Sequence, residues 1–156
     1  TFFLEVNWGD GSRTETFRFG PNASRDVILH HRYLDDGVYA VGLLWRDQRG
    51  GFNTDTLTIR VNNVAPVVDA GGDATLHNGT LNRQVTFTDP GRDTWRATVD
   101  FGDGSPPQVF DLRDSTRFQL RHRFAQPGTY RVTVTVFDDD GGVGTDTFLV
   151  IVPPHP

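Results

Sequence analysis

Carboxylate side chains are crowded at two places in the second half of the sequence. Asp138, Asp139 and Asp140 are consecutive, and Asp89 and Asp93 flank a Pro-Gly-Arg stretch. Ca²⁺ takes roughly six to eight oxygen ligands in flexible geometry, and crowded carboxylates repel one another unless a cation or hydrogen bonds compensate them. We therefore predict a calcium site near the junction between two domains of the chain, built from Asn62, Asn63, Asp89, Asp93, Asp138, Asp139 and Asp140. The alternative is that these residues occupy solvated turns. The sequence contains no EF-hand loop, whose spacing would decide between the two.

Histidine and serine side chains could serve nucleophilic catalysis, but their positions favour a structural role. His31 and His122 each stand two residues before an aromatic residue at a turn, and Ser12 and Ser105 end Gly-Asp-Gly turns. A catalytic serine needs an adjacent base that is oriented by an acid, and a repeated module is a poor place for two copies of one active site. We predict that both histidines are structural and that the chain is not an enzyme. Metal-ligand spacing is also lacking at His30, His77 and His155.

The Gly-Asp-Gly sequences at 9–11 and 102–104 are predicted to form tight turns. Glycine tolerates a positive φ, and an aspartate can accept a hydrogen bond from its own backbone two residues on. A phosphate-binding loop is a poor alternative, because neither a lysine nor a helix follows. We therefore interpret these sequences as structural turns.

Composition excludes several classes of protein. The chain has 156 residues, a net charge of −5, 15 basic residues that are all arginine, and no cysteine. Nucleic-acid binding requires a basic patch, and the missing cysteines exclude disulfides and thiol chemistry. The apolar runs are too short to span a membrane, which takes about 20 residues. We therefore expect neither nucleic-acid binding nor membrane insertion.

The sequence contains two copies of one pattern. Residues 6–12, Val-Asn-Trp-Gly-Asp-Gly-Ser, recur at 99–105 as Val-Asp-Phe-Gly-Asp-Gly-Ser, and His31-Arg32-Tyr33 recurs as His122-Arg123-Phe124. The copies are offset by 91 residues, from 31 to 122, except in the Gly-Asp-Gly block, where the offset is 93. Two such matches in a fixed order indicate a tandem duplication.

Within each copy the apolar residues recur with a period of two. Residues 130–136 alternate apolar and polar side chains, and turn signals such as Gln-Pro-Gly separate this stretch from its neighbours. Short alternating strands with frequent turns predict an all-β sandwich. The predicted core of the second copy is Trp95, Val99, Phe101, Tyr130, Val132, Val134 and Val150, and that of the first is Val6, Trp8, Tyr39, Val41, Leu43 and Ile59.

The sequence Gly-x-Tyr-x-Val occurs once in each copy, at 37–41 and 128–132. In sandwiches of this kind a tyrosine at the corner between strands packs its ring in the core and bonds upstream backbone through its hydroxyl. We expect Tyr39 and Tyr130 to do so.

The motifs resemble, in their order, the polycystic-kidney-disease (PKD) domain, an immunoglobulin-like sandwich. They are Trp/Phe-Gly-Asp-Gly-Ser, His-x-Tyr/Phe, Gly-x-Tyr-x-Val and Asp-x-x-Gly-Gly, each found twice. The resemblance implies two consecutive sandwiches: an incomplete domain at 1–62 that lacks its N-terminal strands, and a complete one at 63–153. Residues 154–156 would begin a linker or tail.

The resemblance implies an extracellular, non-catalytic protein, and three functions stay open. In the first, the pair would be a spacer and adhesive or protein-interaction surface in a large secreted or cell-surface bacterial protein. Alternatively, it is an accessory substrate-binding module of a secreted protease or glycan hydrolase, or a subunit of an extracellular filament assembled by strand complementation.

The implied partners are other modules of the same protein, neighbouring subunits, extracellular proteins or polysaccharides. Ca²⁺ is the only cofactor expected. Exposed aromatic residues in a row on one sheet would favour substrate binding, and the candidates are Phe3, Phe17, Phe19, Phe52 and Phe118.

The first copy is expected to leave part of its core uncovered, because it lacks counterparts of the strands predicted at 67–68 and 85–87. A sandwich without two strands exposes apolar surface and unpaired backbone groups. The uncovered part should lie near Val6, Trp8, Val41 and Leu43. Upstream residues of a longer chain, a partner chain, or a different topology would each complete it.

Overall fold

The regular elements are all β-strands in a computed structural model that describes residues 1–24 and 26–154. The predicted all-β fold is therefore confirmed. Of the predicted tail at 154–156 only residue 154 is described, and His155 lies outside the described residues. The chain divides into two compact units, Thr1–Asn62 and Asn63–Pro156. Within the described part of the chain, no helix is long and apolar enough to cross a membrane.

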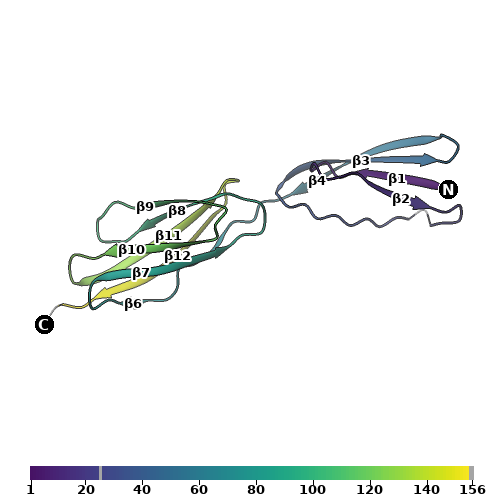
Figure 1. Ribbon diagram of the computed structural model, residues 1–156. Coiled ribbons are helices and arrows are strands. Elements are labelled where there is room, and N and C mark those ends of the chain that lie inside the picture. Colours follow the sequence, from purple (N-terminus) through teal and green to yellow (C-terminus); the bar gives the residue numbers. More distant parts are fainter. Residues whose placement is uncertain (25, 155–156) are drawn as a thin grey trace. The chain divides into compact units, whose positions relative to one another are not determined.

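The second unit is a sandwich of two sheets (Figure 1). Its strands are β5 (Val67–Asp69), β6 (Ala74–Thr75), β7 (Thr80–Thr88), β8 (Trp95–Asp100), β9 (Gln108–Arg113), β10 (Arg117–Arg123), β11 (Gly128–Asp138) and β12 (Val143–Val152). One sheet has the order β6-β12-β11-β8-β9, and the other has the order β10-β7-β5. All pairings are antiparallel except that of β6 with β12.

The core of the second unit follows from the alternation of its strands. Successive side chains of a strand point to opposite faces, so Val132, Val134 and Val136 of β11 all enter the core and are fully buried. Phe101 and Val150 are fully buried as well. All the predicted core residues of this copy are buried except Tyr130, which is half-buried and packs against the edge of the core.

The first unit has a single sheet in place of two. Its strands are β1 (Phe2–Asn7), β2 (Glu15–Phe19), β3 (Gly37–Asp47) and β4 (Phe52–Val61), in the order β2-β1-β3-β4. This order matches β9-β8-β11-β12 of the second unit. Residues 26–33 take the place of β10 and carry no strand assignment, and the segment between β2 and β3 runs along the sheet (Figure 1).

The prediction of where the first core is uncovered was wrong in part. Val6, Trp8 and Val41 are 0%, 8% and 1% exposed, because side chains from the segment between β2 and β3, Val27 and Leu29 among them, pack over them. The remaining predicted core residues are only half-buried: Tyr39, Leu43 and Ile59. The exposed apolar side chains of this face are instead Leu57 of β4 and Phe2 of β1, which are 43% and 47% exposed.

Candidate functional site

Each unit has a Gly-Asp-Gly turn that is pressed against a neighbouring strand. Gly102 has a φ of 70°, and a Cβ at this position would collide with the backbone carbonyl of Arg131 in β11. The Asp103 carboxylate accepts a hydrogen bond from the backbone N–H of Ser105 at 3.1 Å. Asp10 accepts the same bond from Ser12 at 3.0 Å in the first unit. The predicted turns are therefore confirmed.

The second oxygen of each turn aspartate bonds a histidine. The distance from His122 Nε2 to Asp103 Oδ2 is 2.7 Å, and that from His31 Nε2 to Asp10 Oδ2 is 2.8 Å. The histidine and aspartate side chains in both pairs are only 13–16% exposed. Sequence reasoning treated the turn and the histidine separately and missed this pair, although both residues recur together in the two copies.

Aromatic rings fix the orientation of each histidine. The His122 ring stacks on Phe101 with a centroid distance of 3.9 Å and an interplanar angle of 6°, and it meets Phe124 edge-on at 4.8 Å. In the first unit His31 stacks on Trp8 at 4.4 Å and meets the Tyr33 ring at 4.9 Å. The histidine therefore ties the Gly-Asp-Gly turn to the edge of the core.

The turn aspartates stay ionised to low pH. Burial raises the pKa of Asp103, but hydrogen bonds from the Ser105 hydroxyl, His122 and the Ser105 amide outweigh it and lower this pKa to about 2. Hydrogen bonds from the Ser12 hydroxyl and from His31 hold the pKa of Asp10 well below its ordinary value. Each carboxylate is thus more acidic in the folded protein than in an unfolded chain.

This difference predicts how acid acts on the second unit. A carboxylate with a lowered pKa stabilises the fold above its unfolded pKa of about 3.9, and the contribution is lost as the pH falls towards the folded value. We expect the free energy of unfolding to fall between about pH 4 and 2, and the part due to Asp103 to be missing in Asp103→Asn. Urea unfolding of both proteins across this range measures the difference. Asp114→Asn controls for the loss of one charge, and an identical pH dependence of wild type and Asp103→Asn would contradict the prediction.

Ser105 in the turn is not placed as the nucleophile of a catalytic triad would be. Ser105 Oγ donates a hydrogen bond to Asp103 Oδ1 at 2.6 Å, so the aspartate stands between the serine and His122. In a catalytic triad the histidine stands between the serine and the acid, where it can take the serine proton. This arrangement rigidifies a turn, and it does not generate a nucleophile.

The tyrosine hydroxyls bond upstream backbone, as predicted from Gly-x-Tyr-x-Val. Tyr130 donates to the Gln126 carbonyl at 2.8 Å, and Tyr39 donates to the carbonyls of Asp35 and Asp36 at 2.9 and 3.0 Å. These bonds anchor the turn that precedes β11 and β3.

Asp138 organises the hairpin turn between β11 and β12. Its Oδ1 accepts hydrogen bonds from the backbone N–H groups of Asp140 and Gly142, and its Oδ2 accepts one from Asn63 Nδ2 at 2.8 Å. In the hairpin of the first unit, Asp47 Oδ1 accepts from Arg49 and Gly51 in the same way. The carboxylate is therefore a structural part of the repeated hairpin.

The other predicted calcium ligands occupy different environments. Asp139 Oδ1 accepts a hydrogen bond from the Thr94 N–H at 2.8 Å, and Asp89 Oδ2 accepts one from Trp95 Nε1 at 2.7 Å. Asp93 is buried and Asp140 is exposed. Asn62 is the last residue of the first unit, whereas the remaining predicted ligands, from Asn63 onward, belong to the second.

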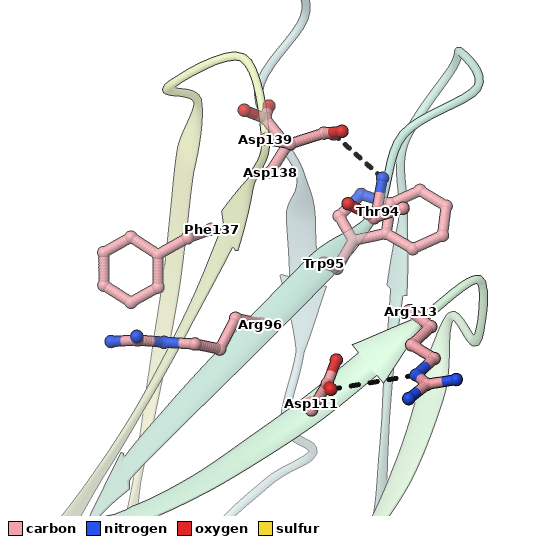
Figure 2. A pocket seen from close by; sticks show the side chains of 8 residues that line it. All are labelled: Thr94, Trp95, Arg96, Asp111, Arg113, Phe137, Asp138 and Asp139. Carbon is pink, nitrogen blue, oxygen red and sulfur yellow. Dashed lines mark hydrogen bonds and ion pairs between the residues drawn. The ribbon is translucent and has the colours of Figure 1, made fainter.

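An open depression of about 520 Å³ lies beside the acidic loops. Figure 2 shows the Asp139–Thr94 bond at its rim, and the Asp111–Arg113 ion pair on the neighbouring strand β9. Burial raises the pKa of Asp89, and the charges of Asp138 and Asp139 raise it further. The charges of Asp138 and Asp139 therefore disfavour the ionised form of Asp89.

The five surplus phenylalanines do not form one row. Phe118 is buried in the second core, and Phe17 and Phe19 pack against the first core. Phe3 and Phe52 point to the outer face of the first sheet, where both are paired in register with Arg46 of β3. Phe52 is 75% exposed, and Phe3 is half-buried.

Comparisons with known proteins agree with this architecture. The PKD domain of an M14-like peptidase from a Thermoplasmatales archaeon is similar over 60% of this chain and 100% of its own, at 22% identity and a TM-score of 0.53. A tetra-tandem repeat in the extending region of a large adhesion protein is similar over 97% of this chain and 41% of its own, at 16% identity and a TM-score of 0.55. At these identities the likeness concerns the fold alone.

No curated protein matches the chain in sequence. The family model of the PKD domain matches residues 63–152, which is more than half of the chain and corresponds to the second unit. The second unit carries the Gly-Asp-Gly turn and the tyrosine corner that the sequence motifs predicted. It also carries the Asp103–His122 pair, which they did not predict. The chain therefore belongs to the PKD domain family.

Proposed function

We propose that the chain is a non-catalytic pair of modules that acts as a spacer and adhesive surface in a large extracellular bacterial protein. The observation that carries this proposal is that the same turn cluster recurs in both units, with His31–Asp10 in one and His122–Asp103 in the other. In each, the groups that could do chemistry hold a turn in place. Duplication of a cluster whose role is structural suits a chain that extends by repetition.

The comparisons support this proposal in two ways. PKD domains are generally non-catalytic modules and are typical of extracellular proteins. The tandem repeat of the large adhesion protein, which is similar over 97% of this chain, lies in a region named for extension. The expected partners are accordingly other modules of the same protein and extracellular proteins or polysaccharides.

The location can be tested with an antibody raised against the chain. We expect the antibody to label intact cells of the source organism or their culture medium, and external protease to remove the label from cells. Labelling that requires lysis of the cells would contradict an extracellular role. An antibody against a cytoplasmic protein serves as the control for lysis.

The second candidate is an accessory substrate-binding module of a secreted hydrolase. It is favoured by Phe3 and Phe52, which flank Arg46 on the outer face of the first sheet, and by the likeness to a PKD domain from a peptidase. Retention of the chain by collagen or insoluble polysaccharide, lost in Phe52→Ala and kept in Thr56→Ala on the same strand, would establish this function. Equal retention of all three proteins would exclude this face.

We further propose that the acidic loops of the second unit bind Ca²⁺. The supporting observation is that Asp89 Oδ1 is buried and has no hydrogen-bond partner among the described residues. Its neighbours Asp138 and Asp139 add negative charge, which a cation would compensate. Asp138 fits less well, because both of its oxygens already accept hydrogen bonds.

Calcium should therefore stabilise the second unit. A ligand that binds only the folded state at about 100 times its Kd raises the free energy of unfolding by about 2.7 kcal/mol. We expect the melting temperature to rise from chelator to millimolar Ca²⁺ in the wild type and to change much less in Asp89→Asn. Asp111→Asn, on the neighbouring strand, should behave as the wild type. An unchanged melting temperature of the wild type would contradict the site.

A further inference from the structure

The inner face of the first sheet is more exposed than the same face of the second unit. Residues correspond at an offset of 91, as Thr54-Asp55-Thr56 and Thr145-Asp146-Thr147 illustrate. Leu57 of β4 is 43% exposed, whereas Phe148, its counterpart in β12, is 2% exposed. Trp45 is half-buried, whereas its counterpart Val136 is fully buried. The first unit thus keeps apolar residues at positions that only a second sheet would cover.

Two backbone edges of the first unit lack the neighbours that cover them in the second. In the second unit β10 pairs with β7 from Arg117–Thr86 to Arg123–Thr80, and β12 is flanked by β6. The counterpart of β10, residues 26–33, has no strand partner among the described residues. The counterpart of β12 is β4, the outermost strand of its sheet. Unpaired edges of this kind are templates for an added strand.

The alternation of residues 26–33 matches that of a strand. Val27, Leu29 and Tyr33 are half-buried against the core, whereas Ile28 between them is 82% exposed. In β10 the equivalent residues Phe118 and Leu120 are buried in the core, and the backbone of β10 is paired with β7 in the same sheet. The segment therefore already presents the correct face to the core and leaves its edge open.

Asp55 supplies a second and independent observation. In the second unit Asp146 accepts hydrogen bonds from the N–H of Thr147 at 2.8 Å and from the N–H of Ala70 at 2.9 Å, just after β5. Asp55 accepts the equivalent of the first bond, from Thr56 at 2.8 Å. The described residues of the first unit include no counterpart of Ala70. A carboxylate on the open face is thus complementary to a backbone N–H of an incoming segment.

We propose that the first unit is a strand acceptor. The occupant is an extended polypeptide segment with the sequence pattern of β5–β7 that is not itself folded into a sheet. Its central strand would run antiparallel to residues 26–33 with apolar side chains facing inward, as Leu81, Val85 and Phe87 do in β7. An N–H of its first strand would bond Asp55. This inference does not depend on the proposed function.

A second folded copy of the chain is a poor donor of this segment. Its β7 already pairs with β10 on one side and with β5 on the other, and Leu81, Val85 and Phe87 are buried in its own core. Donating β7 would open one sandwich in order to close another, with no net gain in buried surface or hydrogen bonds. A donor that starts unpaired gains both.

A synthetic peptide of residues 66–88, added to the full chain, tests the proposal. We expect binding at one peptide per chain, with slower hydrogen exchange in residues 26–33 and β4 and no change in β10 and β12. The matched control is the same peptide with Leu81, Val85 and Phe87 replaced by serine, which should not bind. A covalent version, with residues 63–93 fused before Thr1, should raise the unfolding midpoint of the first unit, and its serine-substituted form should not.

Three outcomes would overturn the proposal. The first is that neither the peptide nor the fusion changes exchange in the first unit. The second is that the serine-substituted forms act equally well. The third is that the chain alone forms dimers in which residues 26–33 are protected, because a second copy would then be the occupant. Slower exchange confined to residues 26–33 and β4, dependent on the apolar side chains, would establish the acceptor.

Discussion

Replacing Gly102 by alanine is expected to destabilise the second unit by about 2–5 kcal/mol. Of this, roughly 1–2 kcal/mol comes from placing an alanine at a positive φ, here 70°. The collision of the new Cβ with the Arg131 carbonyl adds about 1–3 kcal/mol, the usual cost of overpacking. Relief would require the Gly-Asp-Gly turn to move away from β11, which would also strain the bond between Asp103 and His122.

Gly104→Ala is the matched control, because Gly104 lies in the same turn with a φ of 83° and no atom within 4 Å of a Cβ built there. Gly104→Ala should lower the free energy of unfolding only by the cost of placing an alanine at a positive φ, about 1–2 kcal/mol. Chemical denaturation, read in the second unit by hydrogen exchange, measures both variants. Equal destabilisation by the two substitutions would show that the close approach to β11 plays no part in stability.

The first unit repeats this comparison. A Cβ on Gly9 would lie 2.5 Å from the Ala40 carbonyl, whereas one on Gly11 would meet nothing within 4 Å. The positive φ of such glycines could be predicted from the sequence, because Gly-Asp-Gly is a turn signal. The close approach could not be predicted, because it depends on how the turn sits on a strand some 30 residues away.

The fold itself could be predicted because the signals for it are local. Alternation in β11 and the turn residues at its ends specify a half-buried strand, and its tyrosine hydroxyl reaches only four residues upstream, to Gln126. The repeat then places the same elements in both halves. A strand without such a signal, β6, is only two residues long and was not predicted.

The side-chain contacts of the site were harder to predict, because they join residues that are distant in the sequence. Asp103 and His122 are 19 residues apart and meet only when β8 and β10 pack together. Their joint recurrence as Asp10 and His31 was a signal available in the sequence. In the acidic loops the number of aspartates could be read from the sequence, but their hydrogen-bond partners could not. Aspartates that suggest a metal site from their number, Asp138 and Asp139, have hydrogen-bond partners in the turns that surround them.

We expect equivalent leucines to contribute unequally to the stability of the two units, because the first sheet has an open face. Leu120 in β10 is 0% exposed, between the two sheets of the second unit. Its counterpart Leu29 is half-buried and lacks a covering strand. Leu120→Ala should cost about 2–5 kcal/mol, because it removes buried surface and leaves a cavity. Leu29→Ala should cost about 1 kcal/mol or less, since little surface is lost and solvent can fill the space.

The same substitution at equivalent positions of one chain removes differences in side-chain chemistry from this comparison. Hydrogen exchange reports the unfolding of each unit separately, so the two free energies can be measured under one condition. If Leu29→Ala costs as much as Leu120→Ala, then residues 26–33 are as well covered as β10, and the first unit has closed its core without a donor strand. If the cost of Leu29→Ala is small in the chain alone and rises once the 66–88 peptide is bound, the added strand has converted an edge of the first unit into the interior of a sandwich.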